Sequence, residues 1–210
     1  MPNLKTTQSM TQQDKKYIES VIDHFVQKFN FDLLSYNKAY RIWFERNLHK
    51  EIIVDFLRKV NIPANVRLIQ KNTSTPQDPL CKGYITLNKN NPVLFYTEAF
   101  KRIRFEICIH PERYEKFEFF ITTLCHELAH LTLYSTFDKH RESEVATDLF
   151  MMAFGLHEEK KYVSQTHIET PGYISREQTQ YAYEYILKKR ERILNPKKTF
   201  ISSLLKKFFD

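Results

Sequence analysis

The hydrophobic positions in the first quarter of the chain follow the three- and four-residue spacing of an amphipathic helix. After a polar segment over residues 1–13, which we expect to be flexible, Asp14 is a candidate N-cap. The helix it would start has an apolar face made of Tyr17, Ile18, Val21, Ile22, Phe25, Val26 and Phe29. A second helical pattern covers residues 35–56, with a break expected near Asn47. These patterns predict an N-terminal helical region over about residues 14–60.

The middle of the chain has the pattern of extended strands. Residues 66–70 predict one short strand, and residues 83–87 and 92–97 predict a hairpin joined by Asn88-Lys89-Asn90-Asn91. Residues 102–110 alternate between two faces, one of which carries Ile103, Phe105, Ile107 and Ile109. We therefore expect a small, mostly antiparallel sheet, in which residues 102–110 form the clearest strand.

Helical spacing returns after this strand. Pro111 stands where a helix over about residues 112–134 would begin, because the first turn of a helix tolerates proline. A shorter helix is predicted over about residues 142–154, with Gly155 as the residue that ends it.

A last helix is predicted from Ser175, which forms a capping box with Gln178, to about Leu194. The order is therefore helices, then a small sheet, then helices, which indicates an α+β fold. We expect one domain over residues 14–195, followed by a basic amphipathic tail over residues 196–210.

The predicted helix over residues 112–134 contains the motif His126-Glu127-Leu128-Ala129-His130. Residues four apart on a helix lie about 40° apart around its axis, so both imidazoles can reach one metal ion. Glu127 is placed to take a proton from a metal-activated water, as a general base. Zinc in such a site needs a third protein ligand and an open position for water.

The next helix supplies the third ligand. Glu144 would complete a His-His-Glu set, and Asp148, one turn later, could accept a hydrogen bond from the ring nitrogen of a histidine that does not bind metal. His140 is an alternative ligand, but it lies in a polar loop without a supporting carboxylate. Glu142 is near, but the residue four positions later is Ala146, whose methyl group cannot hydrogen-bond to a metal ligand. We therefore expect Zn²⁺ to bind His126, His130 and Glu144.

The pair of motifs H-E-x-x-H and E-x-x-x-D resembles that of the gluzincin metallopeptidases over about residues 80–160. The resemblance implies a zincin-like fold, in which a small sheet packs on the active-site helix and an edge strand binds extended substrate. It also implies three metal ligands, His126, His130 and Glu144, with Glu127 as the general base and Asp148 as a support behind a ligand. The metzincin pattern is excluded, because Leu133 and Thr136 stand where it requires glycine and a third histidine.

The expected activity is hydrolysis of an amide bond in a peptide or protein substrate. The reaction also needs a donor for the tetrahedral oxyanion, and the candidates are His157, Tyr162, His167 and Tyr173. The alternative is a zinc-binding regulatory or interaction protein with little or no peptidase activity. Glu127 favours the enzyme, because a purely structural zinc site has no use for a base.

The composition limits which binding partners and which cellular compartment we expect for this protein. The formal net charge is +7, but the basic residues are scattered apart from the C-terminal end, and no nucleic-acid-binding motif accompanies them. The three cysteines, Cys81, Cys108 and Cys125, form no C-x-x-C pair, so neither disulfides nor a cysteine-ligated metal are expected. Cys125 is expected to be a buried, inert thiol. Without a signal peptide or a long apolar stretch, the expected location is the cytoplasm.

Residues 197–210 mix lysines with a periodic apolar set, namely Phe200, Ile201, Leu204, Leu205, Phe208 and Phe209. At helical spacing these side chains share one face. This pattern favours packing on the core or self-association, and the alternative is a peripheral contact with a membrane surface.

Overall fold

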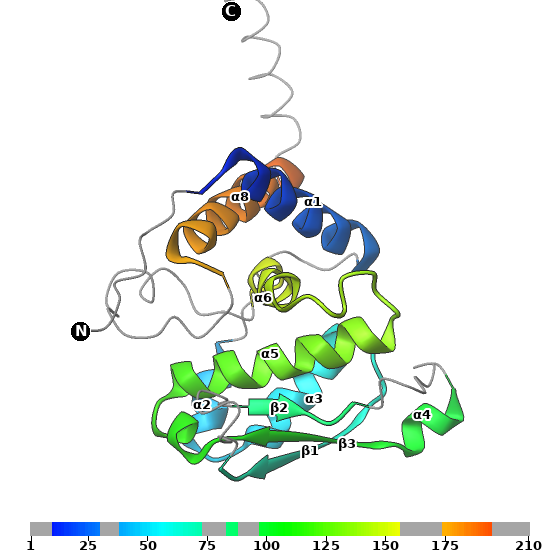
Figure 1. The fold of residues 1–210 in the computed structure, drawn as a ribbon. Coiled ribbons are helices and arrows are strands. Elements are labelled where there is room, and N and C mark those ends of the chain that lie inside the picture. Colours follow the sequence, from blue (N-terminus) through cyan, green and yellow to red (C-terminus); the bar gives the residue numbers. More distant parts are fainter. Residues whose placement is uncertain (1–9, 30–37, 73–82, 88–96, 156–173, 195–210) are drawn as a thin grey trace, which may run out of the picture.

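The computed structural model describes residues 10–29, 38–72, 83–87, 97–155 and 174–194 (Figure 1). In these ranges the α-helices are α1 (Gln12–Phe29), α2 (Ala39–Glu45), α3 (His49–Lys59), α4 (Glu98–Arg102), α5 (Phe117–Ser135), α6 (Glu144–Ala153) and α8 (Arg176–Leu194). The strands are β1 (Asn65–Gln70), β2 (Gly83–Ile85) and β3 (Arg104–Ile109), and a 3-10 helix covers Pro111–Glu115. The predicted mixture of helices and a small sheet is confirmed.

The three strands form one sheet in the order β1-β3-β2. The β2–β3 pair is antiparallel, as expected, but β1 and β3 are parallel, with Asn65 opposite Arg104 and Gln70 opposite Ile109. The prediction of a mostly antiparallel sheet is therefore wrong for the longer pair. Residues 71–103 between β1 and β3 contain β2 and α4, and so the connection is long enough for the crossover that parallel strands require. The alternation of side chains predicts a strand but not its direction.

Helix α5 packs on the sheet, with contacts to β2 and β3 (Figure 1). Phe105, Ile107 and Ile109 of β3 are buried, as their alternation predicted, and Cys108, on the opposite face of the strand, is buried too. Helices α2 and α3 pack beside α5, where the ring of Phe44 lies 5.1 Å from that of Phe120. The sheet, α2 and α3 thus enclose one side of α5.

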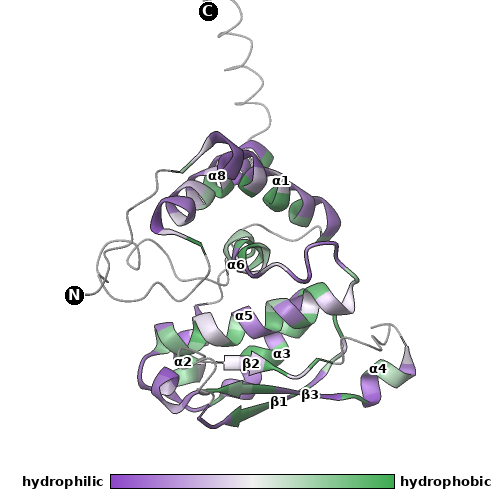
Figure 2. Cartoon of the chain, in the orientation of Figure 1, coloured by the Kyte–Doolittle hydropathy of each residue, from purple (hydrophilic) through white to green (hydrophobic). Residues whose placement is uncertain are grey.

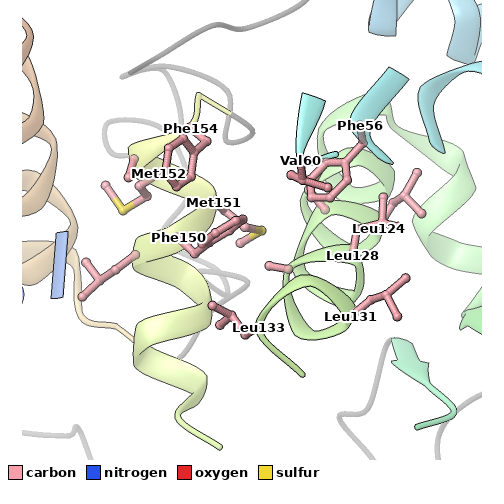
Figure 3. Packing of buried hydrophobic residues seen from close by; sticks show 14 of the residues in the cluster. Phe56, Val60, Leu124, Leu128, Leu131, Leu133, Phe150, Met151, Met152 and Phe154 are labelled. Carbon is pink, nitrogen blue, oxygen red and sulfur yellow. The ribbon is translucent and has the colours of Figure 1, made fainter. Parts of the chain in front are cut away.

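Helix α6 covers the other side of α5 and is itself covered by α1 and α8 (Figure 1). Figure 3 shows part of the resulting core, to which α3 contributes Phe56, α5 contributes Leu124 and Leu128, and α6 contributes Phe150 and Met151. Hydrophilic residues dominate the outermost helices α1 and α8, whereas α6 between them and α5 is largely hydrophobic (Figure 2). Burying apolar surface on both sides of α5 and α6 holds these two helices side by side.

The ends of several helices agree with their predicted signals. Asn47 separates α2 from α3 and has a positive φ of 57°, and Gly155 follows α6 with a φ of 65°. Ser175 and Gln178 form the predicted capping box, in which each backbone N–H donates to the other residue's side chain.

The prediction that Asp14 caps the first helix is wrong. The hydroxyl of Thr11 accepts a hydrogen bond from the Asp14 N–H at 3.1 Å, and the Asp14 carboxylate accepts one from the Thr11 N–H at 2.8 Å. Thr11 is thus the cap and Asp14 is the third helical residue of a capping box. The helix starts earlier than predicted, because the acidic residue closes the box from inside the first turn.

Two further boundaries differ from the prediction. The helix expected over residues 112–134 is divided at Lys116, whose extended backbone separates the 3-10 helix from α5. Residues 98–102, which join the predicted hairpin to the predicted strand and include the first residue of that strand, form α4, because the Thr97 side chain accepts a hydrogen bond from the Phe100 N–H and starts a helix.

The other predictions about the chain ends and connections fall partly beyond these ranges. Residues 92–96 of the second predicted hairpin strand and the predicted tail over residues 196–210 lie outside the described residues. Among the residues that the structure describes, no helix has both the length and the apolar character needed to cross a bilayer.

Candidate metal centre

The side chains of the H-E-x-x-H motif point from helix α5 in two directions. His126 and His130 lie one turn apart and face α6, whose side chains they contact. Glu127, the next residue around the helix, lies on the side of β2. The helix geometry therefore separates the two histidines from the carboxylate that accompanies them.

Helix α6 begins at a defined residue, and this sets which side chains face α5. The hydroxyl of Ser143, the N-cap, accepts a hydrogen bond from the Ala146 N–H at 3.2 Å. Glu144 is thereby the first helical residue, and Asp148 lies one turn further along the same face. The cap and the four-residue spacing together direct both carboxylates at the histidines.

Three potential ligand atoms converge between the two helices. The Nε2 atoms of His126 and His130 are 3.1 Å apart, and Glu144 Oε2 lies 3.1 Å from the first and 3.0 Å from the second. Ligands at the usual zinc distances around a tetrahedron are about 3.3 Å apart, so this triangle has nearly the size that zinc requires. Among the described residues, these three side chains are the group of histidine, cysteine and acidic residues that could hold a metal.

The donor set itself also fits a cation. His130 Nε2 lies within hydrogen-bond distance of both His126 Nε2 and Glu144 Oε2, but a ring nitrogen carries only one hydrogen or one lone pair. A metal ion would satisfy all three atoms at once. The Glu144 side chain is 41% exposed, so this side of the triangle is open to solvent, as a site with a position for water must be.

Asp148 supports His126 from behind. Its Oδ1 lies 2.9 Å from Nδ1 of His126, and its side chain is only 4% exposed. A hydrogen bond from Nδ1–H to this carboxylate leaves the Nε2 lone pair directed at the triangle. Burial opposes protonation of His126, but the hydrogen bonds to Asp148 and Glu144 outweigh it and raise its pKa to about 10. The same histidines hold the pKa of Glu144 well below its usual range, although burial acts in the opposite direction.

Glu127 is held in a confined space between α5 and β2. It is 6% exposed, and burial raises its pKa, against the opposing effect of the two histidines and of the Ile85 backbone N–H. A Cβ on Gly83 would lie 3.4 Å from Glu127 Oε1 and only 2.4 Å from Cγ2 of Thr123. The close approach of β2 to α5 thus depends on a glycine that the sequence marked only as the start of a strand.

The alternative ligands lie elsewhere. The His140 ring packs against the rings of Tyr17, His24 and Phe25, with a distance of 5.3 Å to His24. Neither His140 nor Glu142 belongs to the cluster that could hold a metal in the described ranges. The structure therefore brings together Glu144 and both histidines, with Glu127 and Asp148 beside them. The oxyanion candidates His157, Tyr162, His167 and Tyr173 lie outside the described residues.

The two described cysteines, Cys108 and Cys125, are buried free thiols, and Cys81 lies outside the described residues. Burial raises the pKa of the Cys125 thiol, which suppresses the reactive thiolate.

Comparisons of the chain with protein-family models, with characterised proteins and with solved structures found no match.

Proposed function

We propose that this protein is a zinc-dependent hydrolase of the gluzincin type that cleaves amide bonds in peptides or proteins. The observation that carries the proposal is the triangle of His126 Nε2, His130 Nε2 and Glu144 Oε2, with sides of 3.0–3.1 Å. Asp148 behind His126 and Glu127, the next residue of α5 after His126, supply the other two groups that the proposed hydrolysis would use. The packing of α5 on a small sheet with β2 at its edge agrees with a zincin-like fold.

Zinc bound at this triangle would lower the pKa of a water molecule and polarise a substrate carbonyl. Glu127 would accept a proton from that water and deliver it to the leaving amine. Its raised pKa, which burial causes, brings its proton affinity closer to the working pH and suits it to both steps. Asp148 would hold His126 in the tautomer whose Nε2 is available.

The position of β2 supports a peptide as the substrate. It is one of the two edge strands of the described sheet, and it lies against α5 next to Glu127. The backbone groups on the open side of an edge strand can pair with an extended peptide. A substrate bound in this way would run beside the proposed base.

The metal can be tested directly. Zinc measured by mass spectrometry should be present at one ion per wild-type chain and absent from His126→Ala. Absence of zinc from wild-type protein purified without chelators and then exposed to zinc would disprove the proposal.

Hydrolysis is tested with Glu127→Gln in the zinc-loaded protein, using a mixed peptide library and mass spectrometry of the products. This variant should keep zinc and lose cleavage by about 10²–10⁴-fold, because the water has no base. Glu142→Gln is the matched control, since it makes the same change at an exposed glutamate outside the triangle and should retain activity. Bound zinc without any cleavage by the wild type would favour the regulatory alternative.

A further inference from the structure

The Nδ1 atoms of both histidines point away from the triangle, and among the described residues a carboxylate, that of Asp148, accepts only from His126. His130 Nδ1 instead lies 3.5 Å from Oγ1 of Thr147. We propose that Thr147 is the positioning residue of His130, which holds its ring in the orientation and tautomer that direct Nε2 at the metal. This inference rests on the zinc site proposed above and goes beyond it.

The hydrogen bonds of Thr147 determine the direction of this contact. Its hydroxyl donates to the Ser143 carbonyl oxygen at 3.0 Å, so its hydrogen is already committed and its lone pairs can accept. His130 Nδ1–H can then donate to Oγ1. A proton fixed at Nδ1 leaves the lone pair on Nε2, which is the atom that lies 3.0 Å from Glu144 Oε2.

The position of Thr147 in the fold agrees with this role. Its side chain is fully buried on α6, at the face that Glu144 and Asp148 also occupy. Residues three and four positions apart share a helix face. One turn of α6 therefore provides the proposed metal ligand Glu144 and one supporting residue for each histidine, Thr147 for His130 and Asp148 for His126. The two supports differ in strength, because a buried carboxylate at 2.9 Å binds a donor more strongly than a hydroxyl at 3.5 Å. We expect the contribution of Thr147 to be the smaller one.

Thr147→Val tests the proposal, because it removes the hydroxyl and keeps the shape of the side chain. Zinc affinity, measured by competition with a chromophoric chelator, should fall about tenfold. Thr147→Ser keeps the hydroxyl and should restore most of the affinity. Thr132→Val is the matched control, since Thr132 is also fully buried and donates to the carbonyl four residues earlier, but on α5 and away from the histidine rings.

Equal zinc affinities of wild type, Thr147→Val and Thr132→Val would overturn the role of Thr147 and leave the proposed zinc site intact. Failure of the wild type to bind zinc would instead remove the proposed function itself. A measurement on the wild type alone is independent of how the variants fold. In nitrogen NMR of the zinc-loaded protein, His130 should bind zinc through Nε2, with an Nδ1–H that exchanges slowly with water. Binding through Nδ1, or rapid exchange of this proton, would also overturn the inference.

Discussion

His126 has a carboxylate near each of its ring nitrogens, Asp148 at Nδ1 and Glu144 at Nε2. In the metal-free protein both carboxylates stabilise the imidazolium form. The proposed metal-bound form would use Asp148 and Glu144 as well, Asp148 as a hydrogen-bond acceptor and Glu144 as a second ligand of the metal. A proton and a metal ion therefore compete for the same nitrogen.

This competition predicts that zinc affinity rises with pH across the neutral range. The pKa of metal-free His126 is about 10, so near neutral pH zinc must displace a proton, and the affinity changes about tenfold per pH unit for each proton released. Calorimetric titration with zinc in two buffers of different protonation enthalpy measures that release. Asp148→Asn removes a charge that raises the pKa of His126. Zinc binding to this variant should therefore release a smaller fraction of a proton per zinc ion. An affinity independent of pH would contradict the prediction.

At the scale of elements, the contact between β2 and α5 determines the surroundings of Glu127. Thr123 of α5 donates to the Phe119 carbonyl oxygen at 2.9 Å, which directs its methyl group, Cγ2, at Gly83. No side chain larger than hydrogen fits at residue 83 unless the strand, the helix or the Thr123 side chain shifts. The carboxylate of Glu127 lies next to this contact, so the position of this proposed base depends on how closely β2 packs.

We predict that Gly83→Ala lowers hydrolysis by between about ten- and a hundredfold with little loss of zinc. A strand displaced by the new methyl group would move the Ile85 N–H and release Glu127 from its position, whereas the metal ligands face α6. Steady-state hydrolysis and zinc content of the same sample measure the two effects.

Thr123→Ser provides the rescue, because it removes Cγ2 and keeps the hydroxyl that bonds to Phe119. The double variant Gly83→Ala/Thr123→Ser should recover most of the lost activity. Gly83→Ala with wild-type activity, or a double variant no better than the single one, would show that this contact does not hold the base.

At the scale of the whole molecule, the buried carboxylate of Asp138 ties the outer helix α1 to the turn between α5 and α6. Its Oδ2 lies 2.8 Å from both His24 Nε2 and Lys28 Nζ of α1, and its Oδ1 accepts from the His140 N–H at 2.8 Å. Phe137, with a φ of 50°, turns the chain to bring Asp138 inward. This turn leads directly into Ser143 and Glu144, so Asp138 helps to fix the position of Glu144, the proposed third ligand.

Asp138 should make the fold sensitive to acid. Burial opposes ionisation of Asp138, but hydrogen bonds from Lys28, the His140 N–H and His24 outweigh it and lower the pKa. The stabilisation is therefore complete above the unfolded value of about 3.9 and is lost as the pH falls through the lower folded value.

We predict that Asp138→Asn lowers the free energy of unfolding at neutral pH by about 2 kcal/mol, because the buried side chain loses its charge-assisted hydrogen bonds to Lys28 and His24. It should also flatten the pH dependence on the acid side. Urea unfolding at several pH values measures both effects. Glu98→Gln, in an exposed ion pair with Lys101, is the control and should change little. Equal acid sensitivity of Asp138→Asn and wild type would contradict the assignment.

The sequence alone determined the local parts of this site. The spacing of His126 and His130, and of Glu144 and Asp148, sets the side chains that share a helix face, and this follows from helix geometry whatever the surroundings are. The alternation in residues 102–110 predicted β3, and Ser175, Gln178 and Gly155 predicted helix ends, because each signal acts within a few residues. The predicted start of α1 was wrong because Thr11 and Asp14 form one capping box, and the sequence pattern did not show which of the two residues is the cap.

Only the tertiary structure decided the relations between elements. It chose Glu144 over His140 as the partner of the histidines, since packing buries the His140 ring against α1. It also paired β1 with β3 in parallel, brought Gly83 against Thr123 and Glu127, and placed Thr147 behind His130. These contacts join residues far apart in the chain, and they arise from the simultaneous packing of several helices and the sheet. A local pattern shows which face of an element is apolar, but the shapes of all the elements together determine what that face meets.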